Sequence, residues 1–262
     1  MKYVYGPVHS RRLGNSLGIT TVPPKICSFN CVFCEVGRTT KLTSKRHEYI
    51  KADLILNNVR EFLEDYHGKL DHITFSGFGE PTLNSKLGYI IKEIKKTTDI
   101  PVVVLTNSSL ISRKDVRGDL LNADIVKFSL SAATQEYYNR INQNTLSIRV
   151  EDVIKGIQEF RTHFKGDLWI EIMLVKDIND VIENYIALKE AIKMISPDKV
   201  HINTIVRSPA FSFARPLTMK ELLYAKDIIG HNAEVIPLKY DMSYAQRIFA
   251  QISHGNFMRS FF

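Results

Sequence analysis

The sequence has few of the features that mark secreted or membrane-spanning proteins. No stretch approaches the ~18 consecutive apolar residues that a membrane-spanning helix needs. Its beginning, MKYVYGPVHSRRLG, contains no apolar core of a secretion signal. Cysteine occurs only three times among 262 residues, which makes a disulfide framework improbable. We therefore expect a cytoplasmic protein that does not associate with a membrane.

Internal repeats, low-complexity segments and Gly/Ser-rich linkers are also missing, which favours a single domain over residues 1–262. The net charge of +7 suggests nucleic-acid binding, but most lysines are spread over predicted helix surfaces. Basic residues concentrate only at Arg11-Arg12 and in segment 38–47. We therefore do not expect tRNA to be a partner.

Short apolar runs alternate with amphipathic runs along the chain. The apolar runs are rich in Val and Ile, which predicts parallel strands buried on both faces. These strands are expected at 16–22, 72–77, 102–107, 124–131, 169–175 and 199–206. Helices are expected at 52–67, 86–97, 114–122, 134–142, 149–164, 181–195, 218–230 and 243–254. Asn179 and Asp180 have the residue types of a helix N-cap, and Pro197 ends that helix.

Alternation of strands and helices predicts an α/β protein with a parallel sheet. Six strand–helix units are too few for a closed eight-stranded barrel. An open, partial TIM-like (β/α)6 barrel with parallel strands therefore fits best, and a doubly wound sheet is the alternative. The core is expected over about residues 14–210, followed by a C-terminal helical extension over about 216–262. In either architecture, functional residues belong at the carboxyl ends of the strands.

All three cysteines lie close together, in the segment that follows the first predicted strand. Cys27-x3-Cys31-x2-Cys34 supplies three ligands, whereas a closed structural zinc site takes four, and His47 is not at a usual zinc-finger spacing. A redox pair would leave Cys27 without a role. Three thiolates on a four-iron cluster leave one iron free to bind a small molecule. The missing fourth cysteine therefore favours an active site over a structural site.

This cysteine spacing, with Phe33 before the last cysteine, resembles the signature of the radical S-adenosylmethionine superfamily. A second segment, SGFGEPTL at 76–83, resembles the superfamily's glycine-rich motif for the methionine end of the cofactor. Gly77 and Gly79 would expose backbone groups, and Glu80 would pair with the cofactor's ammonium. The resemblance implies a [4Fe–4S] cluster, S-adenosylmethionine, and an external electron donor such as flavodoxin or ferredoxin. The implied cluster ligands are Cys27, Cys31 and Cys34.

The resemblance extends to polar groups at the strand ends, which in this superfamily commonly meet the ribose or carboxylate of the cofactor. An aliphatic side chain or backbone group commonly stacks on the adenine. The cofactor-binding residues implied in this way are Phe33, Ser76, Gly77, Gly79, Glu80, Asn107, Ser129, Ser131 and Ile205.

The segment from Gly6 to Ile19 and the CEVGRTT run at 34–40 resemble the wyosine-synthetase group of this superfamily, which remodels a guanine of tRNA. The chain departs from that group because it has no cysteines for a second cluster and no tRNA-binding extension. Among compact relatives it is similar to bacterial queuine lyases, which release 7-aminomethyl-7-deazaguanine from free queuine in queuosine salvage. The resemblance therefore implies a radical lyase that acts on a small modified purine-like base.

Recognition of a deazaguanine requires carboxylates and amides, together with donors for its carbonyl oxygen. The substrate-binding candidates are Arg12, Glu48, Asn203, Arg207 and Asp241. No side chain receives a catalytic role, because the cluster-bound cofactor carries the chemistry. Two alternatives remain: a related radical enzyme acting on RNA or a peptide, and a zinc-dependent nucleic-acid-binding module. The open side of the barrel favours a homodimer.

Overall fold

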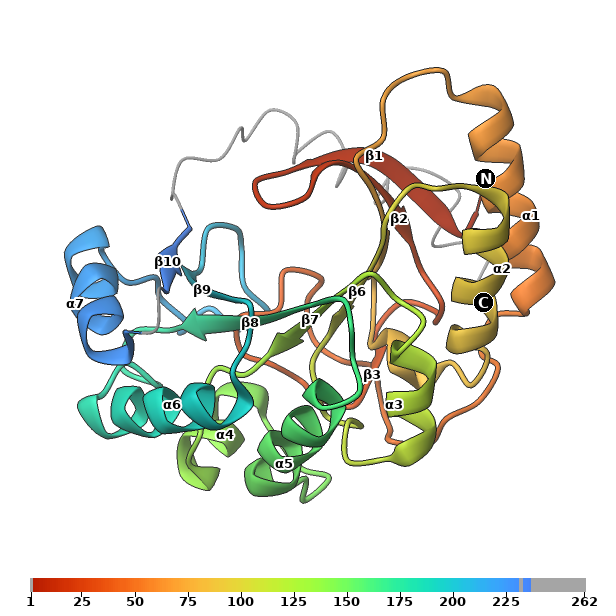
Figure 1. The fold of residues 1–262 in the computed structure, drawn as a ribbon. Helices are drawn as coiled ribbons and strands as arrows, with labels where there is room; N and C mark the ends of the chain where they lie inside the picture. Colours follow the sequence, from red (N-terminus) through yellow and green to blue (C-terminus); the bar gives the residue numbers. More distant parts are fainter. Residues whose placement is uncertain (1, 231–232, 237–262) are drawn as a thin grey trace.

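The computed structural model describes residues 2–230 and 233–236, and its centre is a curved parallel sheet (Figure 1). The six central strands are neighbours in the order in which they occur along the chain. They are β2 (Gly14–Ile19), β5 (His72–Phe75), β6 (Val102–Thr106), β7 (Ile125–Ser129), β8 (Asp167–Leu174) and β9 (Lys199–Thr204). Each strand overlaps one of the six predicted ranges, so the α/β prediction is confirmed.

Two further strands extend the sheet beyond the sequence prediction. β1 (Val4–Ser10) pairs antiparallel with β2, and β10 (Glu234–Val235) pairs in parallel with β9. These two strands form the edges of the eight-stranded sheet, and no pairing joins them within the described ranges. The sheet is therefore open, in agreement with the predicted partial barrel.

Helices cover the outer face of the curved sheet (Figure 1). In α1 (Ala52–Asp65), for example, Ile55, Val59 and Phe62 are buried along one face, while Leu54 is exposed. The other helices are α2 (Leu87–Thr97), α3 (Lys114–Leu120), α4 (Gln135–Asn142), α5 (Val150–Arg161), α6 (Ile182–Ile195) and α7 (Met219–Ile229). Within the part of the chain that the structure describes, no helix combines the length and apolarity required to cross a membrane.

The two faces of the sheet bury different side chains, because successive residues of a strand point to opposite sides. In β6, Val102 and Val104 belong to the main hydrophobic core, whereas Val103 belongs to a second apolar cluster. That cluster also contains Ile125 and Trp169, which lie near the amino ends of β7 and β8, and Leu13, which directly precedes β2. The inside of the curve is therefore filled with apolar side chains near the amino ends of the strands.

Two predicted details differ from the structure or lie outside it. The Asn179 side chain does not cap α6, which begins after Val181. Asn179 is instead buried, where its amide accepts a hydrogen bond from Val175 N at 2.8 Å and donates one to Ser131 O at 2.7 Å. It thus ties the end of β8 to the end of β7. The predicted helix at 243–254 lies outside the described residues, so the predicted extension is described only by α7 and β10.

Candidate active site

A cavity of about 390 Å³ opens at the carboxyl ends of the parallel strands. Its walls come from the cysteine segment, the ends of β5 to β9 and the turn between β1 and β2. Parallel barrels present their functional side chains at this edge. The predicted residues that line the cavity are Arg12, Cys27, Cys31, Phe33, Cys34, Ser76, Gly77, Gly79, Glu80, Asn107, Ser129, Asn203 and Arg207.

The cysteine segment is fixed in place by the apolar residues between its thiols. Phe29 and Val32 are fully buried in the main core, and Val32 N donates to Ile141 O at 3.0 Å. A two-residue strand pair, β3 (Ile26–Cys27) with β4 (Lys41–Leu42), closes the base of the segment. Because its apolar side chains are anchored in the core, the segment presents its three thiols to the cavity.

Each sulfur contacts one polar side chain, in the pairs Lys25–Cys34 at 3.1 Å, Asn107–Cys27 at 3.5 Å and Asn142–Cys31 at 3.4 Å. Burial, followed by the negative charge of Glu80, raises the pKa of Cys27 to about 11. Burial and the two neighbouring thiols raise the pKa of Cys31 well above its ordinary value. A group of thiols in this environment loses its protons readily only when a metal cation compensates the charge.

The three thiols form a donor set of the kind that a four-iron cluster uses. Among the described residues, no three His, Cys, Asp or Glu side chains converge on the position of one metal ion. A four-iron cluster places one thiolate on each of three irons, so its ligands stand apart from one another. The donor set of three partly buried thiols, with the ammonium of Lys25 beside one of them, therefore suits an iron–sulfur cluster.

Glu80 follows β5 and places a carboxylate in the cavity wall beside the cysteines. Its Oε1 accepts hydrogen bonds from Thr82 N, Thr82 Oγ1 and Thr106 Oγ1 at 3.0, 2.6 and 2.7 Å, and its Oε2 accepts from Asn107 N at 2.8 Å. Burial raises the pKa of this carboxyl group. No cationic side chain pairs with it in the described part of the chain. A buried carboxylate without a cation is suited to bind an ammonium group.

The glycines beside Glu80 leave room for a close approach of backbone to backbone. A Cβ on Gly79 would lie 2.0 Å from Ile26 O, and Gly77 adopts a φ of +107°, which side chains rarely allow. Glu80 N donates to the same Ile26 carbonyl at 3.2 Å. The glycine-rich segment is therefore pressed against the start of the cysteine segment, and this contact brings the two motifs together.

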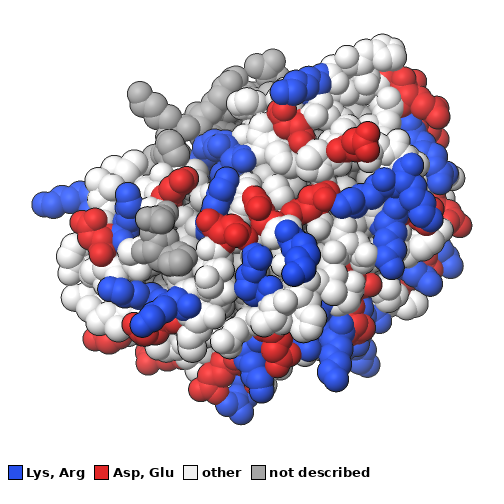
Figure 2. All heavy atoms as spheres, viewed as in Figure 1, with Lys and Arg blue, Asp and Glu red and all other residues white. Residues whose placement is uncertain are grey.

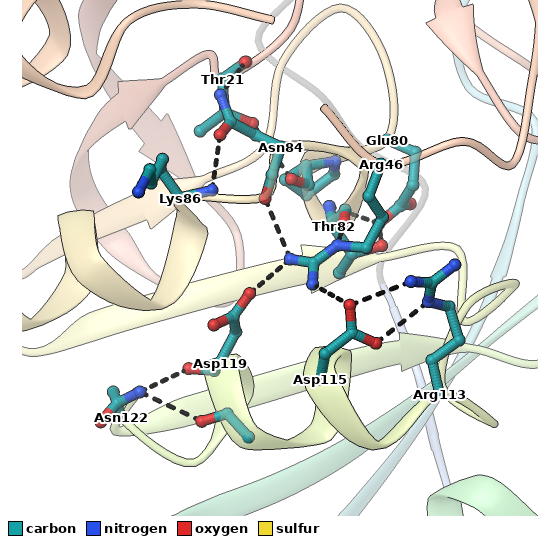
Figure 3. Close-up of polar contacts among 12 residues, drawn as sticks. Thr21, Arg46, Glu80, Thr82, Asn84, Lys86, Arg113, Asp115, Asp119 and Asn122 are labelled. Carbon is teal, nitrogen blue, oxygen red and sulfur yellow. Dashed lines mark hydrogen bonds and ion pairs between the residues drawn. The ribbon is translucent and has the colours of Figure 1, made fainter. Parts of the chain in front are cut away.

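Arg46 supports this segment and does not itself line the cavity (Figure 3). Its Nε donates to Thr82 O at 2.8 Å, within the 3-10 helix η1 (Pro81–Leu83), and its Nη2 donates to the O of Asn84, the residue after this helix, at 3.0 Å. The same guanidinium pairs with Asp115 at 2.7 Å and with Asp119, both on α3, and Asp115 also pairs with Arg113. We call these four charged residues, Arg46, Arg113, Asp115 and Asp119, the Arg46 cluster. It connects the turn that orients Glu80 to an outer helix.

Three of the predicted site residues that the structure describes do not line the cavity. The Ser131 hydroxyl accepts a hydrogen bond from Met173 N at 3.0 Å, and Ile205 packs against the main core. Glu48 accepts from Ala52 N at 2.9 Å, so its carboxylate serves the first turn of α1 instead of a substrate. Asp241 lies outside the described residues.

Several charged residues that are not among the predicted site residues also line the cavity, including Lys127 on β7 and Glu171 on β8. Lys127 is buried, and its Nζ donates to Glu171 Oε2 at 2.5 Å. Each is the only charge within an otherwise apolar stretch, VKF in one strand and WIEIML in the other. Lys127 and Glu171 could have been found from the sequence, because a single charged residue inside a strand that is buried on both faces is unusual.

The structure is an open parallel barrel, and three thiols and the carboxylate of Glu80 lie at one mouth of it. These are the groups that an enzyme needs to bind a metal cluster and an organic cofactor. The chain belongs to the radical SAM superfamily, because the family model described as "Radical SAM superfamily" matches residues 21–188. Members of this superfamily use a [4Fe–4S] cluster and S-adenosylmethionine. The matched range contains both the cysteine segment and the glycine-rich segment.

Similar proteins agree with this assignment. A UPF0026 protein of Methanocaldococcus jannaschii is 37% identical over 237 residues, which cover 88% of this chain and 74% of the relative. A protein of Brachyspira hyodysenteriae named GTPase Obg is 39% identical over 234 residues, but these cover 89% of this chain and only 34% of the relative. This chain thus spans about a third of that protein, and it contains no G-x-x-x-x-G-K-[ST] phosphate loop.

More distant proteins share parts of the chain or its fold. A probable dual-specificity RNA methyltransferase RlmN of Pseudothermotoga lettingae is 25% identical over 220 residues, covering 79% of this chain and 60% of the relative. A radical SAM methyltransferase from Sphaerobacter thermophilus has a similar structure, with a TM-score of 0.64 at 17% identity. That match covers 88% of this chain and 68% of the methyltransferase, and it shows the fold alone.

Proposed function

We propose that this protein binds a [4Fe–4S] cluster through Cys27, Cys31 and Cys34 and holds S-adenosylmethionine beside it, in order to abstract hydrogen from a substrate in the same cavity. The observation that carries the proposal is the meeting of three partly buried thiols with the carboxylate of Glu80, which lacks a cation in the described residues. Electrons would come from an external donor such as flavodoxin or ferredoxin.

The residues around the cofactor would bind and orient it. Glu80 would pair with the ammonium of the methionine end, while Gly77 and Gly79 leave the backbone accessible to it. Asn107 links the two parts of the site, because its N–H donates to Glu80 and its side-chain amide donates to the Cys27 sulfur. When bound, the reduced cluster and S-adenosylmethionine supply one-electron cleavage of the sulfonium, which yields methionine and a carbon radical.

For the substrate, we propose a small molecule, and free queuine is the first candidate because the sequence resembles queuine lyases. In that case the enzyme is a lyase that releases 7-aminomethyl-7-deazaguanine. The distribution of surface charge supports a small substrate: on the face in Figure 2, basic side chains are interspersed with acidic ones. Binding of several RNA phosphates favours clustered cations.

An RNA substrate is the second candidate, because the chain is similar to a protein named as an RNA methyltransferase. The two candidates are separated by one assay. Anaerobically reconstituted protein is incubated with reductant, S-adenosylmethionine and either free queuine or tRNA that contains queuosine, and the products are followed by mass spectrometry. Turnover of the free base alone supports the lyase, and turnover of tRNA alone replaces it with RNA modification.

The cluster and cofactor assignments are tested without a substrate. We expect Cys31→Ala to lose iron and sulfide after reconstitution and to abolish the reductive formation of 5′-deoxyadenosine. Glu80→Gln should keep the iron content but bind S-adenosylmethionine at least about tenfold more weakly, since a charge-assisted bond to the ammonium is lost. Glu151→Gln, at an exposed carboxylate on α5, is the matched control. Undiminished cofactor cleavage by Cys31→Ala would refute the cluster assignment.

A further inference from the structure

Three charged side chains meet in the wall of the cavity, inside the curve of the sheet. Lys127 and Glu171 lie on neighbouring strands, and Arg12 reaches them from the turn between β1 and β2. Glu171 accepts from Lys127 Nζ through Oε2 at 2.5 Å and from Arg12 Nη1 through Oε1. The side chains of Lys127, Glu171 and Arg12 are 7%, 15% and 19% exposed. We call these three residues the Glu171 cluster.

The Glu171 cluster carries two positive charges and one negative charge. Burial alone raises the pKa of Glu171, but the charges of Lys127 and Arg12 outweigh it and lower the pKa to about 2. The carboxylate is therefore ionised at neutral pH. Burial, and next the charge of Arg12, lowers the pKa of Lys127 to about 8, so this lysine is mostly protonated at pH 7.

The neighbouring ionisable groups do not supply the missing negative charge. His201 on β9 faces the same carboxylate, and burial together with Arg12 and Lys127 lowers its pKa to about 4, so it is neutral. Glu35, the other acid whose charge acts on Lys127, already pairs with Arg207. The cluster thus has an excess of one positive charge within the described part of the cavity wall.

Hydrogen-bond donors remain available for a ligand. An ammonium has three N–H groups and a guanidinium has five. In the described residues, the Lys127 ammonium donates only to Glu171, and the Arg12 guanidinium donates only to the same carboxylate. Both residues line the cavity. Burial of an unbalanced charge is costly unless a partner of opposite sign compensates it.

The cavity is therefore polarised between two uncompensated groups. Glu80 offers a negative charge beside the thiols, and the Glu171 cluster offers an excess positive charge on the walls formed by β7 and β8. We propose that the Glu171 cluster is a binding site for an oxyanion, a carboxylate or phosphate group, of a small substrate. Arg12 and Lys127 bind this group directly, and Glu171 holds both cations in position.

This inference goes beyond the proposed function, because it gives the substrate a chemical class that does not depend on the cluster. Free queuine has no anionic group. A demonstrated requirement for an anion would therefore exclude queuine as the substrate and leave the cofactor assignments intact. Conversely, failure of the cofactor assignments in the Cys31→Ala experiment would not affect a test that measures anion binding alone.

The single tryptophan of the chain provides the measurement. Trp169 lies two residues before Glu171 on the same face of β8. Its ring packs edge-on against the ring of His201, with 5.2 Å between the ring centroids. Sodium sulfate is the probe, since it does not titrate between pH 7 and 9, and sodium chloride keeps the ionic strength constant. Sulfate is titrated into the full-length protein while the fluorescence of Trp169 is followed.

We expect Lys127→Met and Arg12→Met each to weaken sulfate binding at least about tenfold, because each removes one of the two cations. Lys199→Met is the matched control: Lys199 lies over the ring of Trp169 at 4.7 Å but does not line the cavity. The affinity of the Lys199→Met variant for sulfate should stay within about twofold of that of the wild type. Each cavity variant leaves one balanced ion pair, so circular dichroism should show native helix content, and either variant alone tests the site.

The affinity should also depend on pH in a definite direction. Lys127 loses its proton as the pH rises through about 8, so sulfate binding should weaken about tenfold between pH 7 and 9. Lys127→Met should not show this change. The proposed site would be wrong if all variants bound sulfate with the affinity of the wild type, or if Lys199→Met lost as much affinity as the cavity variants. If the cavity variants instead lose affinity for S-adenosylmethionine, the anion is the cofactor's own carboxylate and the substrate assignment falls.

Discussion

The Arg46 cluster and the Glu171 cluster are both built from partly buried ionic side chains, but they differ in charge balance and in position. The Arg46 cluster has two arginines and two aspartates, and its guanidinium also donates to two backbone carbonyls of residues that do not line the cavity (Figure 3). The Glu171 cluster has two cations and one carboxylate, and all three side chains line the cavity.

The difference indicates what each cluster does. A balanced group whose donors are satisfied by the protein needs no ligand, and it serves to hold the turn that orients Glu80. An unbalanced group with donors directed into a cavity is completed by a ligand of opposite charge. Ionic clusters should therefore be compared by their net charge and by what their remaining donors face.

The largest effect on stability should come from the centre of the unbalanced cluster. Glu171→Gln removes the only carboxylate between two buried cations, so we expect the free energy of unfolding to fall by about 3 kcal/mol at pH 7. Urea unfolding followed by circular dichroism measures the change. Glu151→Gln serves as the exposed control. A loss below about 1 kcal/mol would show that Lys127 and Arg12 do not depend on this carboxylate.

Arg46→Met should cause a smaller loss of stability, because several partners of Arg46 remain hydrogen-bonded to other groups or to water. We expect the free energy of unfolding to fall by about 2 kcal/mol, since Thr82 O and Asn84 O lose their donor. Binding of S-adenosylmethionine should weaken as well, since Thr82 orients Glu80. Arg46→Lys should recover only part of both losses, because an ammonium cannot form the forked contacts.

Calorimetric titration with S-adenosylmethionine distinguishes positioning from general destabilisation. If Arg46→Met lowers stability but leaves the cofactor affinity unchanged, the Arg46 cluster supports the fold alone. Sulfate binding at the Glu171 cluster should be the same in this variant as in the wild type.

The smallest effect belongs to the outer member of the balanced cluster. Arg113 and Asp115 are about half exposed, so Arg113→Ala should change the free energy of unfolding by about 0.5 kcal/mol or less. Cofactor affinity should not change. A cost above about 1 kcal/mol, measured by urea unfolding, would show that the cluster acts as one cooperative unit and not as a set of separate pairs.

Much of the fold was predictable because its signals are local. The six apolar runs that predict strands correspond to β2 and β5 to β9, and the first seven of the eight predicted helices correspond to α1 to α7. β1 was missed because VYGPVHS contains Gly6-Pro7 and becomes a strand only by pairing with β2. β10 was missed because two residues give no periodic pattern.

The sequence by itself located two of the segments that line the cavity. Cys27, Cys31 and Cys34 lie within one short segment, and Gly77, Gly79 and Glu80 lie within another, so both could be compared with motifs of the radical SAM superfamily before the fold was known. Glu48 was expected at the cavity, and the structure places its carboxylate at the first turn of α1, a contact that the sequence does not reveal.

Only the tertiary structure decided the other end of the cavity. Arg12, Lys127 and Glu171 are separated by more than forty residues from one another, and they meet because β7 and β8 pair with Ser129 opposite Glu171 while the β1–β2 turn folds over both strands. A shift of one residue in that register would turn Glu171 towards the helices. Charge balance is a property of groups that are close in space, and the sequence specifies that proximity only through the complete fold.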